Sequence, residues 1–176
     1  MKRLVSQFTK QLLEALEIGK SAKLKTNKNE ISSMVITGLG GSGIGGTIAI
    51  QLVAAQLKIP VIINNDYTLP EFVNENTLVI VSSFSGNTEE TLEALKKAQL
   101  AKAEIACITS GGKLAEIAKT KNYNLIILPK AFSPRAMLTY SVVQQLFLFN
   151  HYGLINDSFI NEIVSTVSLL DKENDN

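Results

Sequence analysis

The sequence predicts an α/β fold, a three-layer αβα sandwich built on a five-stranded parallel sheet. Three observations predict it. Five short runs rich in Val, Ile and Leu are spread along the chain, segments with helical spacing lie between most of them, and loops rich in glycine or hydroxyl residues follow several of the runs. Continuous apolar runs are typical of parallel strands that helices cover on both faces. In such sheets the carboxyl ends of the strands meet at one edge, where ligands bind.

The apolar runs predict strands at residues 34–37, 60–64, 77–82, 105–109 and 125–128. Apolar side chains that recur every three or four positions predict helices at residues 4–17, 47–57, 87–100, 114–120, 135–152 and 159–170. Pro60 begins the second strand, where a missing N–H is tolerated, and Gly19 and Gly153 are expected to end helices. We divide the chain into a helix with its connector at 1–30, a central α/β domain at 31–155, and a helix with its tail at 156–176.

The composition argues against several classes of partner. The 176 residues are 45% hydrophobic and 19% charged, with a formal net charge of +1, which is ordinary for a globular domain. This charge gives no field that would favour nucleic acid or a membrane surface, and no run is long enough to span a bilayer. The amino terminus has no long apolar stretch of the kind found in a signal peptide, so we expect a cytoplasmic protein. The single cysteine, Cys107, lies in an apolar run and is interpreted as a small buried side chain.

A glycine-rich loop, GLGGSGIGG at residues 38–46, joins the first predicted strand to the next helix. Glycines let the backbone adopt positive φ and let a ligand come close, while a helix start offers free N–H groups and a positive dipole end. The loop therefore predicts an anion site. Gly38, Gly40 and Gly43 also fit the dinucleotide fingerprint, but the acidic residue expected about 20 positions later has only Asp66 as a candidate. Dinucleotide binding and a purely structural turn stay as alternatives.

A second loop, SSFSGNTEET at residues 82–91, follows the third predicted strand. Hydroxyls at Ser83, Ser85 and Thr88 surround a glycine at the start of a helix, and hydroxyls with backbone N–H groups can hold a phosphate without a lysine. The alternative is ordinary helix capping by Ser85 or Thr88, with two glutamates in the first turn. We interpret the loop as a phosphate site.

Together these two loops resemble the sugar isomerase (SIS) domain family, and within it the bifunctional phosphoglucose/phosphomannose isomerases. Further segments that carry the resemblance are LLEALEIGKSAKL, CITSGGKL and SPRAMLTYSVVQQL, so that it extends from about residue 12 to 154. The resemblance implies a flavodoxin-like or Rossmann-like SIS domain at 31–155. It implies interconversion of glucose 6-phosphate or mannose 6-phosphate with fructose 6-phosphate through a cis-enediolate, with no metal or other cofactor.

The resemblance also implies roles for individual residues. The reacting end of the sugar would be lined by Gly40, Gly41 and Ser42, and the phosphate would be held by Ser83, Ser85 and Thr88. Arg135, in a Pro-Arg-Ala element, would face the reacting carbons as the catalytic residue. A guanidinium stays protonated, so it would stabilise the charge of the enediolate and would not act as the base. The alternative for Arg135 is a surface position at a helix start.

The sequence departs from the family in length. Its members are about twice as long and carry a second SIS half, which supplies a glutamate base, a histidine from a neighbouring subunit and a lysine. The only histidine here, His151, is interpreted as structural, and Glu89 or Glu90 is a weak candidate for a base. Thr47 and Thr139 replace an aspartate and a glycine that are more usual at these places.

We therefore expect an amino-terminal SIS half that binds a hexose 6-phosphate and catalyses poorly alone. The alternative is a SIS module that binds a phosphosugar and regulates a partner without catalysis. The last predicted helix has an apolar face, which predicts self-association or pairing with a second SIS half.

Overall fold

The computed structural model describes residues 7–26, 29–130 and 137–174. Within these residues it contains the strands β1 (Ser33–Thr37), β2 (Val61–Asn64), β3 (Thr77–Ser82), β4 (Glu104–Thr109) and β5 (Asn124–Ile127). It also contains the helices α2 (Phe8–Ser21), α3 (Gly41–Leu52), α4 (Glu89–Leu100), α5 (Gly112–Lys121), α6 (Leu138–His151) and α7 (Ser158–Asn174). The strands form one parallel sheet in the order β2-β1-β3-β4-β5. This is the order of flavodoxin-like sheets.

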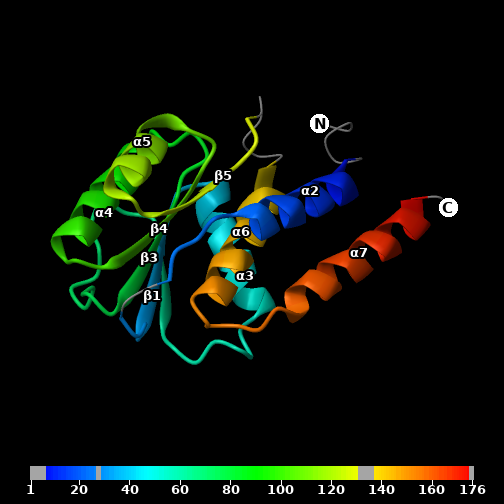
Figure 1. Ribbon diagram of the computed structural model, residues 1–176, viewed down its shortest axis with the longest axis horizontal. Helices are drawn as coiled ribbons and strands as arrows, with labels where there is room; N and C mark the ends of the chain where they lie inside the picture. The colour runs from blue at the N-terminus through cyan, green and yellow to red at the C-terminus, as the bar shows by residue number, and fades with distance from the viewer. Residues whose placement is uncertain (1–6, 27–28, 131–136, 175–176) are drawn as a thin grey trace.

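Helices cover both faces of the sheet, with α4 and α5 on one side and α2, α3 and α6 on the other (Figure 1). The strand side chains alternate between the two cores. In β1, Met34 and Ile36 belong to the core under α2, α3 and α6, whereas Val35 belongs to the core under α4 and α5. Burying each such side chain contributes about 1.5–3 kcal/mol. The predicted three-layer αβα sandwich is confirmed, and Cys107 is buried in the second core as expected.

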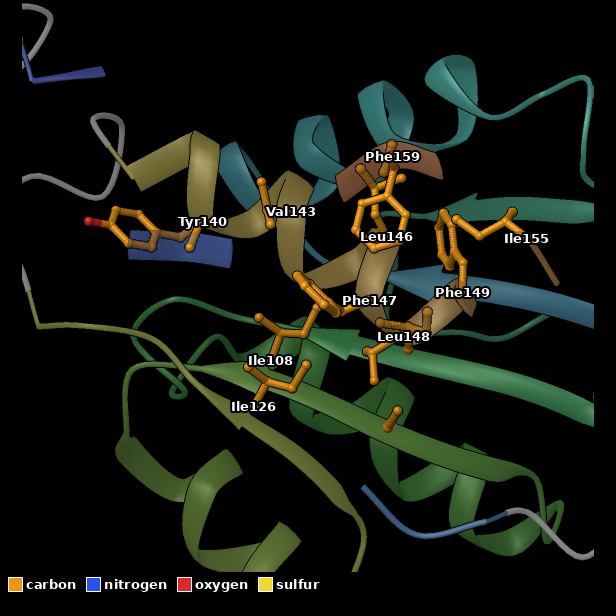
Figure 2. Packing of buried hydrophobic residues seen from close by; sticks show 14 of the residues in the cluster. Ile108, Ile126, Tyr140, Val143, Leu146, Phe147, Leu148, Phe149, Ile155 and Phe159 are labelled. Carbon is orange, nitrogen blue, oxygen red and sulfur yellow. The ribbon is translucent and has the colours of Figure 1, made fainter. Parts of the chain in front are cut away.

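The larger core is centred on α6, whose apolar side chains reach the sheet and the neighbouring helices. Figure 2 shows Phe147 beside Ile108 and Ile126 of the sheet. The Phe147 ring also meets the ring of Phe159 edge-on, with 5.1 Å between the ring centroids. A Cβ at Gly19 would overlap the Phe147 ring, so Gly19 lets α2 pack directly on α6. The prediction that Gly19 ends its helix is therefore wrong, because α2 continues to Ser21 and the glycine serves packing.

Helix α3 begins six residues earlier than the predicted start at residue 47, inside the glycine-rich loop. Its glycines are explained by close packing. A Cβ at Gly45 would overlap the Ser141 hydroxyl on α6, and a Cβ at Gly46 would lie 3.0 Å from methyl groups of Ile36 and Ile63. Helix propensity disfavours glycine by about 1 kcal/mol per residue, but these contacts outweigh it. The segment is thus both the turn and the first half of the helix.

The connector after α2 is fastened to β5 and α6 by polar contacts. The backbone N–H of Lys25 donates to Asn124 Oδ1 at 2.7 Å, and Asn124 Nδ2 donates back to the Lys25 carbonyl at 3.0 Å. The His151 Nε2 atom lies 2.7 Å from the same carbonyl oxygen. The Tyr152 hydroxyl donates to Glu104 Oε1 at 2.8 Å and accepts a hydrogen bond from Asn124 Nδ2. Burial is the main cause that raises the pKa of Tyr152, and the Glu104 carboxylate raises it further, whereas the hydrogen bond from Asn124 lowers it in part. This network serves the fold and lies at the amino-terminal ends of β4 and β5.

Along the described parts of the chain, no helix is both long and apolar enough to pass through a bilayer.

Candidate active site

The two loops predicted to bind the ligand lie side by side, because β1 and β3 are neighbours in the sheet. Both loops leave the carboxyl ends of these strands. The glycine loop is tied to the sheet by the N–H of Gly38, which donates to the Asn64 carbonyl at 3.1 Å. Gly40 stands just before α3 with φ 53°, a left-handed value that favours glycine. Among the described residues no side chain caps α3, so the positive end of its dipole stays uncapped beyond the carboxyl end of β1.

The β3–α4 loop, residues 83–88, is held together by its own hydroxyls. Ser83 Oγ lies 2.8 Å from Thr88 Oγ1 and accepts a hydrogen bond from the Gly86 N–H at 3.1 Å. Ser85 Oγ accepts from the Asn87 N–H at 3.2 Å, and the Ser85 side chain is exposed. Thr88 takes the N-cap position of α4, but its hydroxyl makes no capping hydrogen bond. Helix capping therefore accounts for the position of Thr88 at the start of α4. It does not account for its hydroxyl, which lies against Ser83 and caps no backbone N–H.

The β4–α5 loop supports the β3–α4 loop from the side. The Ser110 hydroxyl and N–H both donate to the Phe84 carbonyl, at 2.7 and 3.0 Å. Asn87 Oδ1 accepts from the Lys113 N–H at 3.1 Å. Gly86 has φ 69°, and a Cβ there would overlap the carbonyl oxygen of Gly111. These supporting residues did not appear in the sequence-based site, although the glycine pair after the fourth strand was a signal for them.

One cavity of about 290 Å³ opens between these loops and the start of α6, and we call it the edge cavity. Its volume is close to the lower end of the range for small-molecule sites, about 300–1,000 Å³. It is lined by Leu39, Gly40, Gly41, Ser42, Phe84, Ser85, Thr88, Leu128, Met137, Leu138 and Ser141. A larger hollow, about 740 Å³, lies between segments 30–31, 56–59 and 152–156, but it contains no residue of either loop.

The edge cavity brings together five of the seven residues named from the sequence: Gly40, Gly41, Ser42, Ser85 and Thr88. Ser83 does not line it. That side chain is buried beneath the loop, only 3% exposed, where its hydroxyl positions Thr88. Arg135 lies outside the described residues. Leu128, two residues before the last described residue on one side, and Met137, the first described residue on the other side, both line the cavity.

None of the described residues that line the edge cavity is charged or a histidine. The two glutamates at the start of α4 also stand apart from it. Desolvation first, and then the carboxylates of Glu89 and Glu90, raise the pKa of Tyr67, which Glu90 contacts through a hydrogen bond. His151 is ten residues beyond Ser141 on α6, about 15 Å along the helix axis. Among the described residues, no three acidic, histidine or cysteine side chains gather where they could hold a metal ion.

The sheet order defines a doubly wound α/β domain, and the edge cavity lies at the carboxyl edge of the sheet, where proteins of that class usually bind ligands. A family model, the SIS domain, matches residues 29–154. The chain belongs to the SIS domain family.

Relatives narrow this similarity further. The chain is 46% identical over 166 residues to a bifunctional phosphoglucose/phosphomannose isomerase of Caldicellulosiruptor bescii, covering 93% of this chain and 49% of the relative. It is 36% identical over 165 residues to a protein of the same name from Thermoplasma acidophilum, covering 88% of this chain and 50% of the relative. The chain thus spans about half the length of the curated relatives it matches.

A solved structure of a proposed phosphosugar isomerase from Clostridium difficile superposes with a TM-score of 0.73. The superposition covers 94% of this chain and 50% of that protein, at 20% sequence identity. At this identity the likeness supports the fold alone.

Proposed function

We propose that this chain is the phosphosugar-binding half of an isomerase that interconverts glucose 6-phosphate or mannose 6-phosphate with fructose 6-phosphate. The observation that carries the proposal is the meeting of the two loops in one cavity of suitable size. The identity to bifunctional phosphoglucose/phosphomannose isomerases supports the choice of substrate.

In this proposal the phosphate binds to the β3–α4 loop, where the start of α4 provides positive potential in place of a lysine. The Ser85 hydroxyl is exposed and lines the cavity, so it donates directly to a phosphate oxygen. Thr88 lines the cavity as well, and Ser83 fixes the Thr88 hydroxyl from behind. Ser83 thus acts on the phosphate through Thr88, which refines the direct contact inferred from the resemblance.

The sugar extends from the phosphate toward Gly40, Gly41 and Ser42 at the start of α3. Negative charge develops on the oxygens of the enediolate during proton transfer between C1 and C2, and the amides at a helix start stabilise such charge. Arg135 is proposed to add a guanidinium there. This proposal is supported by Leu128 and Met137, which precede and follow Arg135 in the chain and both line the cavity.

Isomerisation also needs a base that moves the proton between the two carbons. The described lining of the edge cavity offers no carboxylate, imidazole or amine. We therefore propose that the base comes from a second SIS half, paired with this one in a cytoplasmic protein. The same observation favours a second candidate function, a SIS module that binds a phosphosugar and regulates a partner without turnover.

Two measurements on the chain test these functions. Calorimetry with fructose 6-phosphate is expected to show saturable binding, and its absence refutes both candidates. A coupled assay that starts from fructose 6-phosphate is expected to show weak or no turnover. If the reading frame continues past Asn176, the same assay on the longer product tests the isomerase, and no turnover there leaves the binding module. Saturable NAD binding that survives Ser83→Ala and Ser85→Ala would instead favour a dinucleotide site.

A further inference from the structure

One side of the edge cavity is formed by the first turn of α6, and it carries a polar residue that the proposed function does not use. Ser141 lines the cavity and is only 5% exposed. Ser141 lies against Gly45 of α3. A Cβ placed on Gly45 would overlap the Ser141 hydroxyl and lie 2.9 Å from the Ser141 Cβ. The position of Ser141 is therefore fixed by the packing of α6 on α3.

The Ser141 hydroxyl has no hydrogen-bond partner among the described residues. Leaving a buried hydroxyl unpaired destabilises a fold, and native structures seldom keep such groups without a ligand or water to satisfy them. Gln145, one turn further along α6, is fully buried, and within the described parts of the chain neither its amide oxygen nor its amide nitrogen has a hydrogen-bond partner. Its Nε2 atom would lie 3.5 Å from a Cβ at Gly45, so both residues face the same part of α3.

We propose that Ser141 is a substrate-contacting residue that donates a hydrogen bond to a hydroxyl of the sugar. The inference rests on the proposed function and adds a contact to it. Rotation about the Cα–Cβ bond of Ser141 changes the side to which its hydroxyl points, so a ligand in the cavity can recruit it. Gln145 makes no hydrogen bond to Ser141 in this structure, but in the proposed complex its buried amide is the group near enough to hold the turned hydroxyl or a bridging water.

The surroundings of Ser141 select the neutral part of the ligand. Its neighbours in the cavity lining are the apolar side chains of Leu128, Met137 and Leu138. An apolar lining disfavours the doubly charged phosphate group. It suits the carbon chain of the sugar, because the carbons contact the apolar side chains and one neutral hydroxyl pairs with Ser141. The phosphate belongs to the β3–α4 loop, where amides and the start of α4 favour charge.

The test is calorimetry on the full chain with two probes, fructose 6-phosphate and inorganic phosphate. Ser141→Ala is expected to weaken fructose 6-phosphate binding by roughly three- to tenfold, as for the loss of one neutral hydrogen bond, and to leave phosphate binding unchanged. Ser85→Ala is expected to weaken both. The melting temperature of Ser141→Ala should stay level or rise, because an unpaired buried hydroxyl is removed.

Thr91→Val is the matched control. Thr91 is fully buried and its hydroxyl also lacks a partner among the described residues, but it does not line the edge cavity. Both affinities should be unchanged in this variant. Wild-type fructose 6-phosphate affinity in Ser141→Ala, with the Ser85→Ala loss intact, overturns this inference alone. An equal loss for phosphate also overturns it, because Ser141 would then act on the phosphate or the fold. No binding by the wild-type chain overturns the proposed function and this inference together.

Discussion

Gly86→Ala tests whether the β3–α4 loop depends on its contact with the β4–α5 loop. Gly86 has φ 69°, where a side chain costs about 1–2 kcal/mol. Its Cβ would also overlap the Gly111 carbonyl oxygen and lie 2.8 Å from the carbonyl carbon. Both are backbone atoms, so no side-chain rotation relieves the clash and one loop must move. We put that movement at a further 1–3 kcal/mol or so, which gives a total loss of about 2–5 kcal/mol.

Gly153→Ala is the control for the backbone conformation alone. Gly153 has φ 72°, and apart from its own and the adjoining residues no described residue has a heavy atom within 4 Å of the position that a Cβ would take. Its loss should stay at about 1–2 kcal/mol. Urea unfolding of the two variants and the wild type measures the loss of unfolding free energy in each variant. The comparison holds when the unfolding free energy depends on urea concentration with the same slope in all three proteins. Equal losses in both variants would refute the proposed role of the Gly111 contact. Calorimetry on Gly86→Ala should also show weaker phosphate binding, because the displaced loop carries Ser85.

Three further predictions concern the site and the core. Ser85→Ala should weaken phosphosugar binding by about 1.5–3 kcal/mol, the value for a hydrogen bond to a charged group, and unchanged affinity in calorimetry would place the phosphate elsewhere. In an active, longer protein, Arg135→Ala should lower kcat more than it raises KM, whereas a pure KM effect would mean ground-state binding only. Burial raises the pKa of Cys107 from 9.0 to about 12, so the folded state holds its proton more tightly than the unfolded state does. The resulting contribution to the free energy of unfolding is complete below about pH 9 and is lost as pH rises toward 12. Urea unfolding should therefore show that the free energy of unfolding falls less between pH 9 and 12 in Cys107→Ala than in the wild type.

The sheet could be predicted from the sequence because its strands are covered on both faces. Continuous apolar runs mark such strands clearly, and the predicted run at 77–82 coincides with β3. The start of α3 could not be predicted in the same way. Its glycines indicate a loop by propensity, and only the contacts of Gly45 and Gly46 with α6 and the strands explain a helix there.

The candidate site was predictable where its residues lie in the loops and helix starts that follow the strands. Ser42, Ser85 and Thr88 follow β1 and β3, and the topology alone brings those strand ends together. The spacing of residues along the chain does not show in which direction a side chain points. Ser83 was therefore expected in the site, although its side chain is buried and does not line the edge cavity. Ser141 lies far along the chain in an apolar helix, and only tertiary packing places it in the cavity lining.

The close approach of α3 and α6 has a consequence for how SIS domains of this kind can diverge. Since glycine at positions 45 and 46 of α3 lets this helix come close to α6, the separation of the two helices fixes one dimension of the edge cavity independently of the β3–α4 loop. Substitutions in the β3–α4 loop can then alter which chemical groups the edge cavity recognises, while the width of this compartment stays the same. A bulkier residue at either glycine would instead push α3 away from its neighbours and change the size of molecule that the compartment admits, and at Gly45 it would also displace the hydroxyl of Ser141.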